Sequence, residues 1–550
     1  MKQLFKLLNF SLILIFIVAI FLHRDSSITQ DLGRHLTLGK IIWETKSIPS
    51  RNIFSYTNTD FPFINHHWGS EVIIYLLHNR FAIDGLILLK LILILISFGI
   101  LVFYSQKTSQ PVILLLVSLI SLQIVRDRTE IRPEIFAYLF FSLILILLYR
   151  EKEKEQSLIW LMPLFILIWV NLHISFVLGL ALYALFIFDR IVLGKLKAKY
   201  LLLGIIILLT TLINPAGWKG AIYPLQIFNS YGYPVFENQS PFFLEKLTSI
   251  SAISYYKIAS IFFLLISPIL IWKRKIFEAG TVILTGVISI SAVRHFPFFA
   301  LSIIYPLSFG MGLLLTRCEK LLKHKEKFFF IVKISTYIII LSLISWEIYM
   351  LVSNKYYNYR SSDLRTGFGT VKGIKGAVDF FLTHNLSGPI FNNFDIGSYL
   401  IYRLYPKQLV FVDGRPEAYP ASFFQDIYIP MQEEKNKWES IVNQYNFQTI
   451  IFSHTDITPW AQKFLERIVK DPVWGTVYFD DYSIVLTRIH NITKDMIRID
   501  SKEKIKNYGL TIIQETNQPD ALFRLSHFFD IVNLTELRDL ALLKTKEFIY

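Results

Sequence analysis

The chain has 550 residues, of which 53% are hydrophobic and only 18% are charged. Its mean hydropathy of +0.45 and its repeated apolar runs exclude a water-soluble protein and predict a polytopic α-helical membrane protein. The net charge of +14 does not indicate nucleic-acid binding, because most Lys and Arg residues stand in short connections that orient helices in the membrane. The single cysteine, Cys318, excludes an intramolecular disulfide framework and a cysteine-based metal cluster.

Apolar runs that are predicted to cross the membrane follow one another along the first two thirds of the chain. They lie at about 7–22, 85–104, 111–125, 135–149, 158–172, 174–188, 200–213, 255–272, 279–293, 296–315 and 328–352. Several are shorter than the roughly 20 residues that a spanning helix needs, so flanking residues must complete them. Connections rich in Lys and Arg alternate with poorer ones. We therefore expect about 11 transmembrane helices in a cell (inner or plasma) membrane, with a cytoplasmic N-terminus and an extracytoplasmic C-terminal region.

The first outer loop, residues 24–71, carries the most informative acidic residue of the chain. The segment DLGRHLTLGKIIWE opens with Asp31, just after the first span, and predicts an amphipathic helix that lies on the membrane. The segment WGSEVIIYLLH predicts a second short helix, which begins near Glu71 and ends before Gly85 opens the next span. Asp31 has two interpretations, a helix N-cap and a general base or acceptor-orienting carboxylate, and the first does not exclude the second.

An arginine-rich corner follows on the outer side. In RDRTEIRPE, residues 126–134, three arginines alternate with three acidic residues, so a self-paired rim is one interpretation. The other is a phosphate site formed by Arg128 and Arg132, because the guanidinium fork binds oxyanions bidentately. Arg294 and His295 add a second positive corner on the same side.

Further polar residues on the outer side are candidates to bind a substrate. They are His35, His67 and His173, and His66, Asn171 and Asn214 are further polar residues on the same side. For His173, satisfying the backbone of the tight hairpin NLHIS is an equal alternative, and Asn214 is more typical of a helix end. The inner connections carry only Lys, Glu and Arg of the kind that fixes orientation, so an active site is expected to face outward. Lys90, near the outer end of its span, is predicted to extend to the membrane interface.

The chain changes character after about residue 354. GPIFNN, QLVFVDG and TIIFSH alternate with helical patterns, and WGTVYFDDYSIVLTRI is typical of a hairpin. We predict a transmembrane domain over 1–353, a soluble α/β domain with mostly parallel strands over 354–490, and a helical tail over 491–550. Asp395, Asp413 and Arg415 stand at predicted strand ends, where they either face the membrane site or make ordinary turns and salt bridges.

Taken together, these motifs resemble the GT-C superfamily of membrane glycosyltransferases. The resemblance covers about residues 7–490, extends to a group of bacterial membrane proteins near that superfamily, and is carried by DLGRHLTLGKII, HHWGSE, IRPEIFAYL, WVNLHISFVLGL, LINPAGW, RHFPFFA and NNFDIGSYLIYRL…VFVDGRPEAYP. It implies a polyprenyl-phosphate-linked sugar donor and a role for Asp31 as base or acceptor anchor. Glu71 is a second catalytic candidate, to which that role does not automatically transfer. Several relatives bind a divalent metal through paired acidic residues, which the first outer loop lacks, so metal dependence stays open.

The predicted reaction is transfer of a hexosyl or pentosyl group to an envelope glycan, lipid or protein on the extracytoplasmic face. Arg128, Arg132 or Arg294 would hold the donor phosphate, while Asp31 orients or deprotonates the acceptor hydroxyl. Two alternatives remain: a transporter or flippase of lipid-linked saccharide, and a non-catalytic GT-C-like scaffold that binds glycan. A transporter is expected to place polar sites near the bilayer midplane, whereas the predicted span interiors are nearly free of charge.

Overall fold

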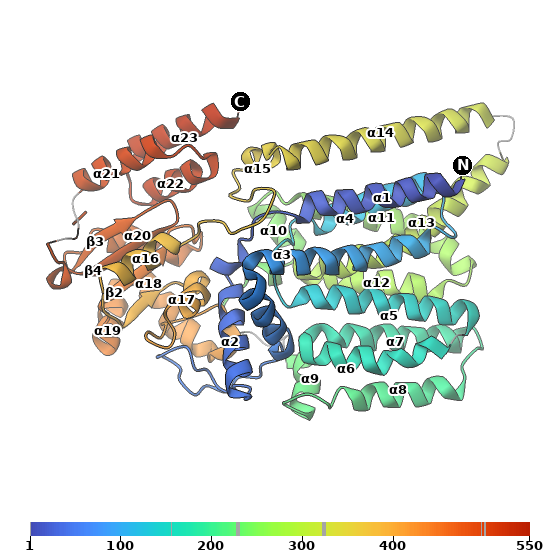
Figure 1. Ribbon diagram of the computed structural model, residues 1–550, viewed down its shortest axis with the longest axis horizontal. Helices are drawn as coiled ribbons and strands as arrows, with labels where there is room; N and C mark the ends of the chain where they lie inside the picture. The colour runs from blue at the N-terminus through green and yellow to red at the C-terminus, as the bar shows by residue number, and fades with distance from the viewer. Residues whose placement is uncertain are drawn as a thin grey trace.

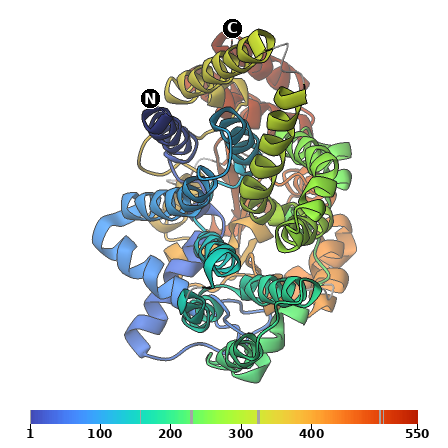
Figure 2. The ribbon, with the colours of Figure 1, turned by 90° about the vertical axis from the view of Figure 1, so that its right-hand side faces the viewer.

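The computed structural model describes residues 2–155, 157–226, 231–321, 326–494, 496, 498–499 and 502–549. A bundle of long helices lies beside a smaller C-terminal domain (Figure 1), and the view along the bundle shows its helices end on (Figure 2). The bundle comprises α1 (Lys2–Phe21), α3 (Trp68–Ser105), α4 (Pro111–Val125), α5 (Glu134–Lys154), α6 (Met162–Leu172), α7 (Val177–Val192), α8 (Ala198–Thr210), α11 (Ser251–Trp272), α12 (Ile276–Ser291), α13 (Phe296–Leu321) and α14 (Glu326–Val352). Each predicted apolar run falls on one of these helices.

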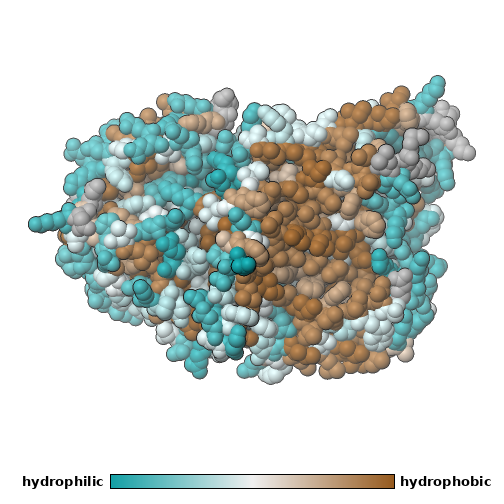
Figure 3. All heavy atoms as spheres, viewed as in Figure 1, coloured by the Kyte–Doolittle hydropathy of each residue, from teal (hydrophilic) through white to brown (hydrophobic). Residues whose placement is uncertain are grey.

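The surface of the bundle fits a membrane. Figure 3 shows a broad hydrophobic band over the transmembrane helices, with hydrophilic residues at both ends. Among the described residues, five helices are long and apolar enough to cross a bilayer, and five more apolar helices are shorter. The predicted number of 11 spans stays a prediction.

The first outer loop differs from its prediction in one respect. Helix α2 (Leu32–Thr45) forms as expected, but Leu32 and Leu36 are buried in protein and do not lie on the membrane. The helix packs between the start of α3 and α17 (Gly397–Leu404). Two glycines permit this close packing: a Cβ at Gly33 would stand 2.6 Å from the Ser398 carbonyl oxygen, and one at Gly39 only 2.1 Å from the Glu71 carbonyl oxygen. Small residues on two faces of α2 therefore let two neighbouring elements approach it closely.

Helix α3 contains the predicted break between an outer helix and a span. Ala82 has φ 51° and ψ −154°, which separates the segment that starts at Trp68 from the membrane-spanning part. A Cβ at Gly85 would stand 2.5 Å from the Cβ of Phe81, so the turn after the break requires a residue without a side chain.

The sheet of the C-terminal domain corrects the prediction of mostly parallel strands. Strands β1 (Ile390–Asn392), β2 (Thr449–Ser453), β3 (Trp474–Phe479) and β4 (Ser483–Arg488) are ordered β1-β2-β4-β3, and only β1 and β2 are parallel. The short connection between β3 and β4 forces those two strands to be antiparallel, and β4 then pairs with β2. The predicted hairpin WGTVYFDDYSIVLTRI is confirmed.

The segment QLVFVDG does not join the sheet as predicted. Val410 pairs instead with Ser55 of the first outer loop. The Asn392 side chain takes up the neighbouring backbone groups, accepting from the Phe411 N–H (3.0 Å) and donating to the Val412 carbonyl (2.8 Å). An extended apolar segment can thus satisfy its backbone without a strand on each side.

Helices complete the outer part of the molecule. They are α9 (Trp218–Gln226), α10 (Pro241–Leu247), α15 (Lys355–Tyr359), α16 (Lys375–Thr383), α18 (Ile429–Glu433), α19 (Lys435–Tyr445), α20 (Pro459–Ile468) and the tail helices α21 (Lys502–Glu515), α22 (Pro519–Ile531) and α23 (Thr535–Ile549). The tail is held to the domain by ion pairs that Arg365 and Arg524 make with Asp520 and Asp481. Residues 495, 497, 500 and 501, near the predicted start of the tail, lie outside the described residues.

The end of the bundle far from the C-terminal domain, which is predicted to face the cytoplasm and is called the inner end below, carries buried ion pairs that its sequence did not predict. The Lys152 ammonium contacts the Asp189 carboxylate at 2.8 Å and the Glu278 carboxylate at 2.5 Å, and all three side chains are buried at the ends of α5, α7 and α12. Lys90 also corrects its prediction: it is buried and donates to the Thr129 carbonyl at 2.7 Å, so it does not extend to the interface. The carbonyl that accepts from Lys90 lies in the connection between α4 and α5, and the carboxylates that contact Lys152 lie on α7 and α12. These partners are distant in sequence, so local patterns could not predict them.

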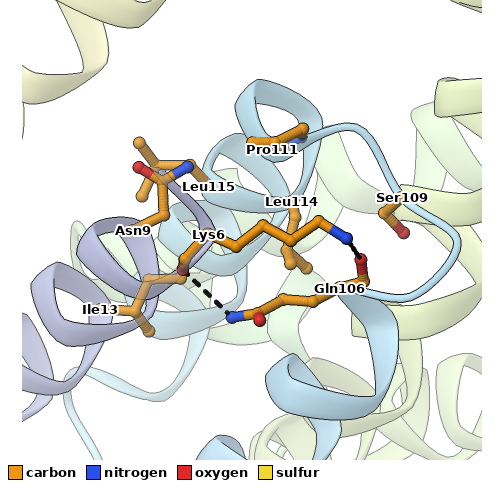
Figure 4. Close-up of a pocket in the computed structure, with 8 residues that line it drawn as sticks. All are labelled: Lys6, Asn9, Ile13, Gln106, Ser109, Pro111, Leu114 and Leu115. Carbon is orange, nitrogen blue, oxygen red and sulfur yellow. Dashed lines mark hydrogen bonds between the residues drawn. The ribbon is translucent and has the colours of Figure 1, made fainter. Parts of the chain in front are cut away.

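A small cavity lies between α1 and α4 (Figure 4). Its lining residues are Lys6, Asn9, Ile13, Gln106, Ser109, Pro111, Leu114 and Leu115. The Lys6 ammonium donates to the Gln106 carbonyl at 2.7 Å. The cavity holds about 10 Å³, which is room for one water molecule. It lies at the N-terminal end of α1, whereas Asp31 follows the opposite end of that helix.

Candidate active site

Asp31 stands at the start of α2 with its carboxylate turned away from the helix backbone. It occupies the N-cap position, yet its side chain makes no capping hydrogen bond. One carboxylate oxygen lies 3.5 Å from Arg34 Nε and the other lies 3.5 Å from Arg132 Nη1, and 22% of the side chain remains exposed. The sequence left two roles for Asp31, a helix N-cap and a functional carboxylate, and its side chain does not form the cap. The carboxylate is held between two guanidinium groups and stays open to an incoming molecule.

A glycine from the C-terminal domain makes room for this carboxylate. A Cβ at Gly414 would stand 2.8 Å from Asp31 Oδ1. Its neighbours Asp413 and Arg415 form a fully buried bidentate pair with bonds of 2.7 and 2.8 Å, and Arg415 also donates to the Asn52 side chain. Burial alone would raise the pKa of Asp413, but the Arg415 guanidinium brings it below its usual value. The side chains of these two predicted site residues bind each other and fix the loop behind Asp31. Neither side chain faces the Asp31 carboxylate.

Three predicted arginines converge on one carboxylate, that of Glu237 in the 3₁₀ turn η4 (Phe236–Asn238). Arg128 and Arg132 each contact Glu237 Oε2 at 2.7 Å, and Arg294 lies 4.0 Å from Oε1. We call Arg128, Arg132 and Arg294 the arginine cage. Burial opposes ionisation of Glu237, but Arg132 and Arg128 hold its pKa well below the usual value. Arg132 therefore joins the cage to Asp31.

Sequence reasoning missed Glu237. The self-paired rim exists only in part: Arg128 contacts Glu134 at 2.5 Å, whereas Arg132 reaches out of its own segment. Glu237 lies more than 100 positions from either arginine, so no spacing rule connects them. Its one local signal is to be an isolated acidic residue in the aromatic segment YPVFENQS.

Glu71 lies at the first turn of α3, fully buried, and supports α2. One of its oxygens contacts His35 Nδ1 at 2.8 Å, and the other accepts from Asn65 Nδ2 at 2.6 Å. The ring of His67 lies 5.6 Å from that of His35 and 5.0 Å from that of His173. Burial lowers the pKa of His35 and His67 well below the usual value, so these imidazoles are neutral at pH 7. Glu71 thus has both oxygens engaged in positioning.

The motifs NLHIS and LINPAGW meet HHWGSE at the outer end of α6. His173 accepts a hydrogen bond from the Ser175 N–H at 3.2 Å, which is the backbone role considered for it. Asn171 accepts from the Trp68 indole at 3.0 Å. Beside them lies a shallow hollow of about 390 Å³, lined by Trp68, Asn171, Ile213, Asn214 and Pro215. His295 follows Arg294 in η5 (Val293–His295) at the nearby cage corner.

Asp395 approaches Asp31 from the C-terminal domain. It lies in η7 (Phe394–Ile396), directly before α17, and its side chain is exposed. Partial removal from water, together with the negative charges of Asp456 and Asp31, raises the pKa of Asp395 to about 7. Asp456 is held by Asn393 Nδ2 at 3.1 Å. Of the three predicted residues of the soluble domain, Asp395 is therefore the one whose pKa is affected by the charge of Asp31.

The metal dependence that the sequence left open stays a prediction. No three His, Cys, Asp or Glu side chains within the described ranges are arranged to hold a metal ion. Asp31 faces Arg34 and Arg132 with its two oxygens. The chemistry below is accordingly derived from the side chains of the chain alone.

The arrangement of a helical bundle beside a C-terminal outer domain is shared with solved oligosaccharyltransferase structures. Oligosaccharyltransferase AglB from Archaeoglobus fulgidus, solved with an inhibitory peptide and a dolichol-phosphate, is similar with a TM-score of 0.57 and 9% identity, over 92% of this chain and 77% of that chain. Its apo form gives 0.57 and 9%, over 91% and 77%.

ArnT from Cupriavidus metallidurans, bound to undecaprenyl phosphate, is similar with a TM-score of 0.48 and 13% identity, over 90% of this chain and 98% of that chain. No protein-family model and no curated protein sequence matches the chain. At 9% identity the likeness to AglB establishes the fold alone, and the reaction has to be argued from the site.

Proposed function

We propose that this chain is a membrane glycosyltransferase that moves a sugar from a polyprenyl-phosphate-linked donor to an envelope glycan, lipid or protein on the extracytoplasmic face. The observation that carries the proposal is the Asp31 carboxylate, which is free of the helix backbone and shares Arg132 with the arginine cage. The fold supports it, because AglB of the same fold was solved with a dolichol-phosphate.

The proposed reaction uses one carboxylate and the cage. An acceptor hydroxyl placed at Asp31 attacks the anomeric carbon of the donor while its proton passes to the carboxylate. The bond between the anomeric carbon and the phosphate oxygen breaks, and polyprenyl phosphate leaves with one more negative charge than the donor phosphodiester carried. Guanidinium groups of the cage stabilise that charge as it develops. One base and a good leaving group suffice, so no nucleophile triad is needed.

No specific observation favours the transporter alternative. In the described spans, the buried ionic groups Lys152, Asp189 and Glu278 gather at the inner helix ends, and Lys90 is fixed to a carbonyl near the outer end of its span. A transporter of this architecture would place its binding groups near the middle of the membrane. The polar groups around Asp31 and Glu237 converge beyond the helix ends, beside Gly414 of the C-terminal domain. Figure 1 shows this domain at that end of the bundle.

The test is release of polyprenyl phosphate by the purified full-length protein in lipid nanodiscs. Labelled polyprenyl-phosphate sugars are supplied together with extracted envelope acceptors, and wild type is compared with Asp31→Asn. Loss of a general base is expected to lower turnover by about 10²–10⁴-fold. The matched control is Asp60→Asn, in the same outer loop, whose side chain is 76% exposed and paired only loosely with Arg51. It should turn over donor at the wild-type rate.

Two outcomes would count against the proposal. Equal turnover by Asp31→Asn and wild type would remove the assigned role of Asp31. Absence of turnover with every donor and acceptor, in protein that still binds undecaprenyl phosphate, would favour the binding scaffold or the transporter.

A further inference from the structure

The segment 231–239, which lies between α9 and α10 in the chain, contacts both the helical bundle and the C-terminal domain. We call it the crossing segment. At one end Glu237 lies in the arginine cage, and the Gln239 carbonyl accepts from the Val293 N–H at 3.2 Å. At the other end the Tyr233 ring stacks on that of Phe394, with centroids 4.2 Å apart, and a Cβ at Gly232 would stand 2.4 Å from the Ala421 carbonyl oxygen.

The cage cannot hold Glu237 and a second anion in the same place. Arg128 and Arg132 aim one guanidinium nitrogen each at a single carboxylate oxygen of Glu237. These charge-assisted donors are the ones that a phosphate oxygen would take. A phosphate beside the carboxylate would bring two negative charges together in a partly buried place, and repulsion there is weakly screened by salt.

Whether a carboxylate can leave the cage depends on the secondary-structure element that carries it. Glu134, which also contacts Arg128, belongs to the first turn of α5 and cannot leave without unwinding that helix. Glu237 belongs to a single 3₁₀ turn with extended backbone on both sides, so it can withdraw by rotation of a few loop residues. Asp31, which lies 3.5 Å from Arg132, is held at the start of α2 and is the proposed base. Of the three carboxylates in contact with the cage, Glu237 is therefore the one that an incoming anion can replace.

We propose that Glu237 occupies the donor-phosphate position until the donor arrives, and that the phosphate displaces it and frees the crossing segment from the cage. This inference rests on the proposed phosphate role of the arginine cage. The crossing segment also packs on Phe394, the residue before Asp395, so its release is transmitted to the acceptor side of Asp31. Donor binding thereby precedes and permits acceptor binding.

The direction in which Glu237→Gln changes the affinity for undecaprenyl phosphate distinguishes a displaceable Glu237 from one that only holds the arginines in place. If Glu237 competes with phosphate, Glu237→Gln strengthens binding of undecaprenyl phosphate. We expect about a tenfold gain in affinity, within the range typical of coupling between two sites. If Glu237 merely holds the arginines in place, the same substitution weakens binding or leaves it unchanged, and that result would overturn the proposal.

A second measurement uses wild-type protein and so survives any folding defect of the variant. Hydrogen exchange of residues 231–239, followed by mass spectrometry in nanodiscs, is expected to speed up when undecaprenyl phosphate is added. The Glu134→Gln variant removes a cage carboxylate on a rigid helix and should keep this response. An exchange rate that is unaltered or slower in wild type on addition of undecaprenyl phosphate would also overturn the proposal.

These measurements need no turnover. Failure of the displacement device and failure of the glycosyltransferase proposal are consequently distinguishable. An active enzyme with a static crossing segment would overturn only the device. An inactive protein that binds undecaprenyl phosphate and releases the segment would overturn only the enzyme assignment.

Discussion

The two ends of the helical bundle each carry a buried ionic network, and they are built differently. At the inner end, Lys152, Asp189 and Glu278 all come from transmembrane helices and satisfy one another. At the outer end, Glu237, the shared partner of the arginine cage, comes from a loop, and Asp31 keeps part of its carboxylate exposed. Buried charge alone therefore does not mark a site. A site is indicated where one partner can leave and another group is open.

The largest expected effect is at the inner network. Lys152→Met leaves Asp189 with Arg190 and Glu278 with Lys275, so each buried carboxylate loses its closest ammonium partner but keeps a second cation. We expect the free energy of unfolding to fall by about 3 kcal/mol, the lower range for breaking a buried ion pair. Denaturant unfolding in detergent measures it. The folded fraction should bind undecaprenyl phosphate as wild type does, and weaker binding would contradict the separation of the two ends.

A surface pair at the same end provides the control. Lys197 pairs with Glu155, and both side chains are more than 40% exposed. Lys197→Met should change the unfolding free energy by less than about 1 kcal/mol. If Lys197→Met lowered the unfolding free energy as much as Lys152→Met does, burial would not explain why the two ion pairs contribute differently to stability.

A substitution in the arginine cage is expected to weaken phosphate binding more than it lowers the free energy of unfolding. Arg132→Gln removes the cation that contacts both Glu237 and Asp31. Charge-assisted hydrogen bonds contribute about 1.5–3 kcal/mol, so affinity for undecaprenyl phosphate is expected to fall by about 10–150-fold. The loss of unfolding free energy should be smaller than in Lys152→Met, because the Arg132 and Glu237 side chains are each 18% exposed and Glu237 keeps Arg128. Arg360→Gln, at an exposed outer pair with Asp127, is the control and should bind normally. Equal affinity in Arg132→Gln would exclude the cage as phosphate site.

The sequence allowed the helical part of this comparison to be predicted. Apolar runs located the bundle helices, and the position of Gly85 separated the outer helix at Glu71 from the following span, where the break at Ala82 is found. Asp31 was expected at the start of a helix outside the first span, which is where it lies. Such features depend on residues within a few turns of one another, so local patterns contain them.

The remaining features depend on partners far away in the chain. Mostly parallel strands were expected, but pairing of β4 with β2 was not encoded in either segment alone. Glu237 could not be linked to its arginines, and the burial of Lys152 depends on two other helices. Asp413 and Arg415 were expected either to face the membrane site or to make an ordinary salt bridge, and only the structure shows that they pair with each other in a fully buried place.

The loop that this buried pair supports gives a smaller test of the outer end. Gly414→Ala would place a Cβ about 2.8 Å from Asp31 Oδ1, so the carboxylate must shift. We expect turnover to fall by about tenfold, because misplacement of a reacting group by a fraction of an ångström is costly. Binding of undecaprenyl phosphate, measured in parallel, should be retained, since the cage does not touch Gly414. Weaker phosphate binding would show that the loop supports the cage as well.

The smallest expected effect is a pH dependence at Asp395. Its folded-state pKa is raised from the ordinary value of 3.8 to about 7, so between these values the folded protein retains a proton that the unfolded chain has lost, and because the side chain is exposed, screening by solvent keeps the effect on stability small. Asp395 therefore favours folding most below pH 4, and its contribution declines as the pH rises to 7. Asp395→Asn should remove this decline, and the difference in melting temperature between variant and wild type should grow from pH 4.5 to 7.5. The buried neutral histidines titrate in the opposite sense, but they are common to both proteins and cancel in that difference. A difference that is independent of pH would mean that Asp395 is ionised throughout, and that its carboxylate does not share the acceptor side with Asp31.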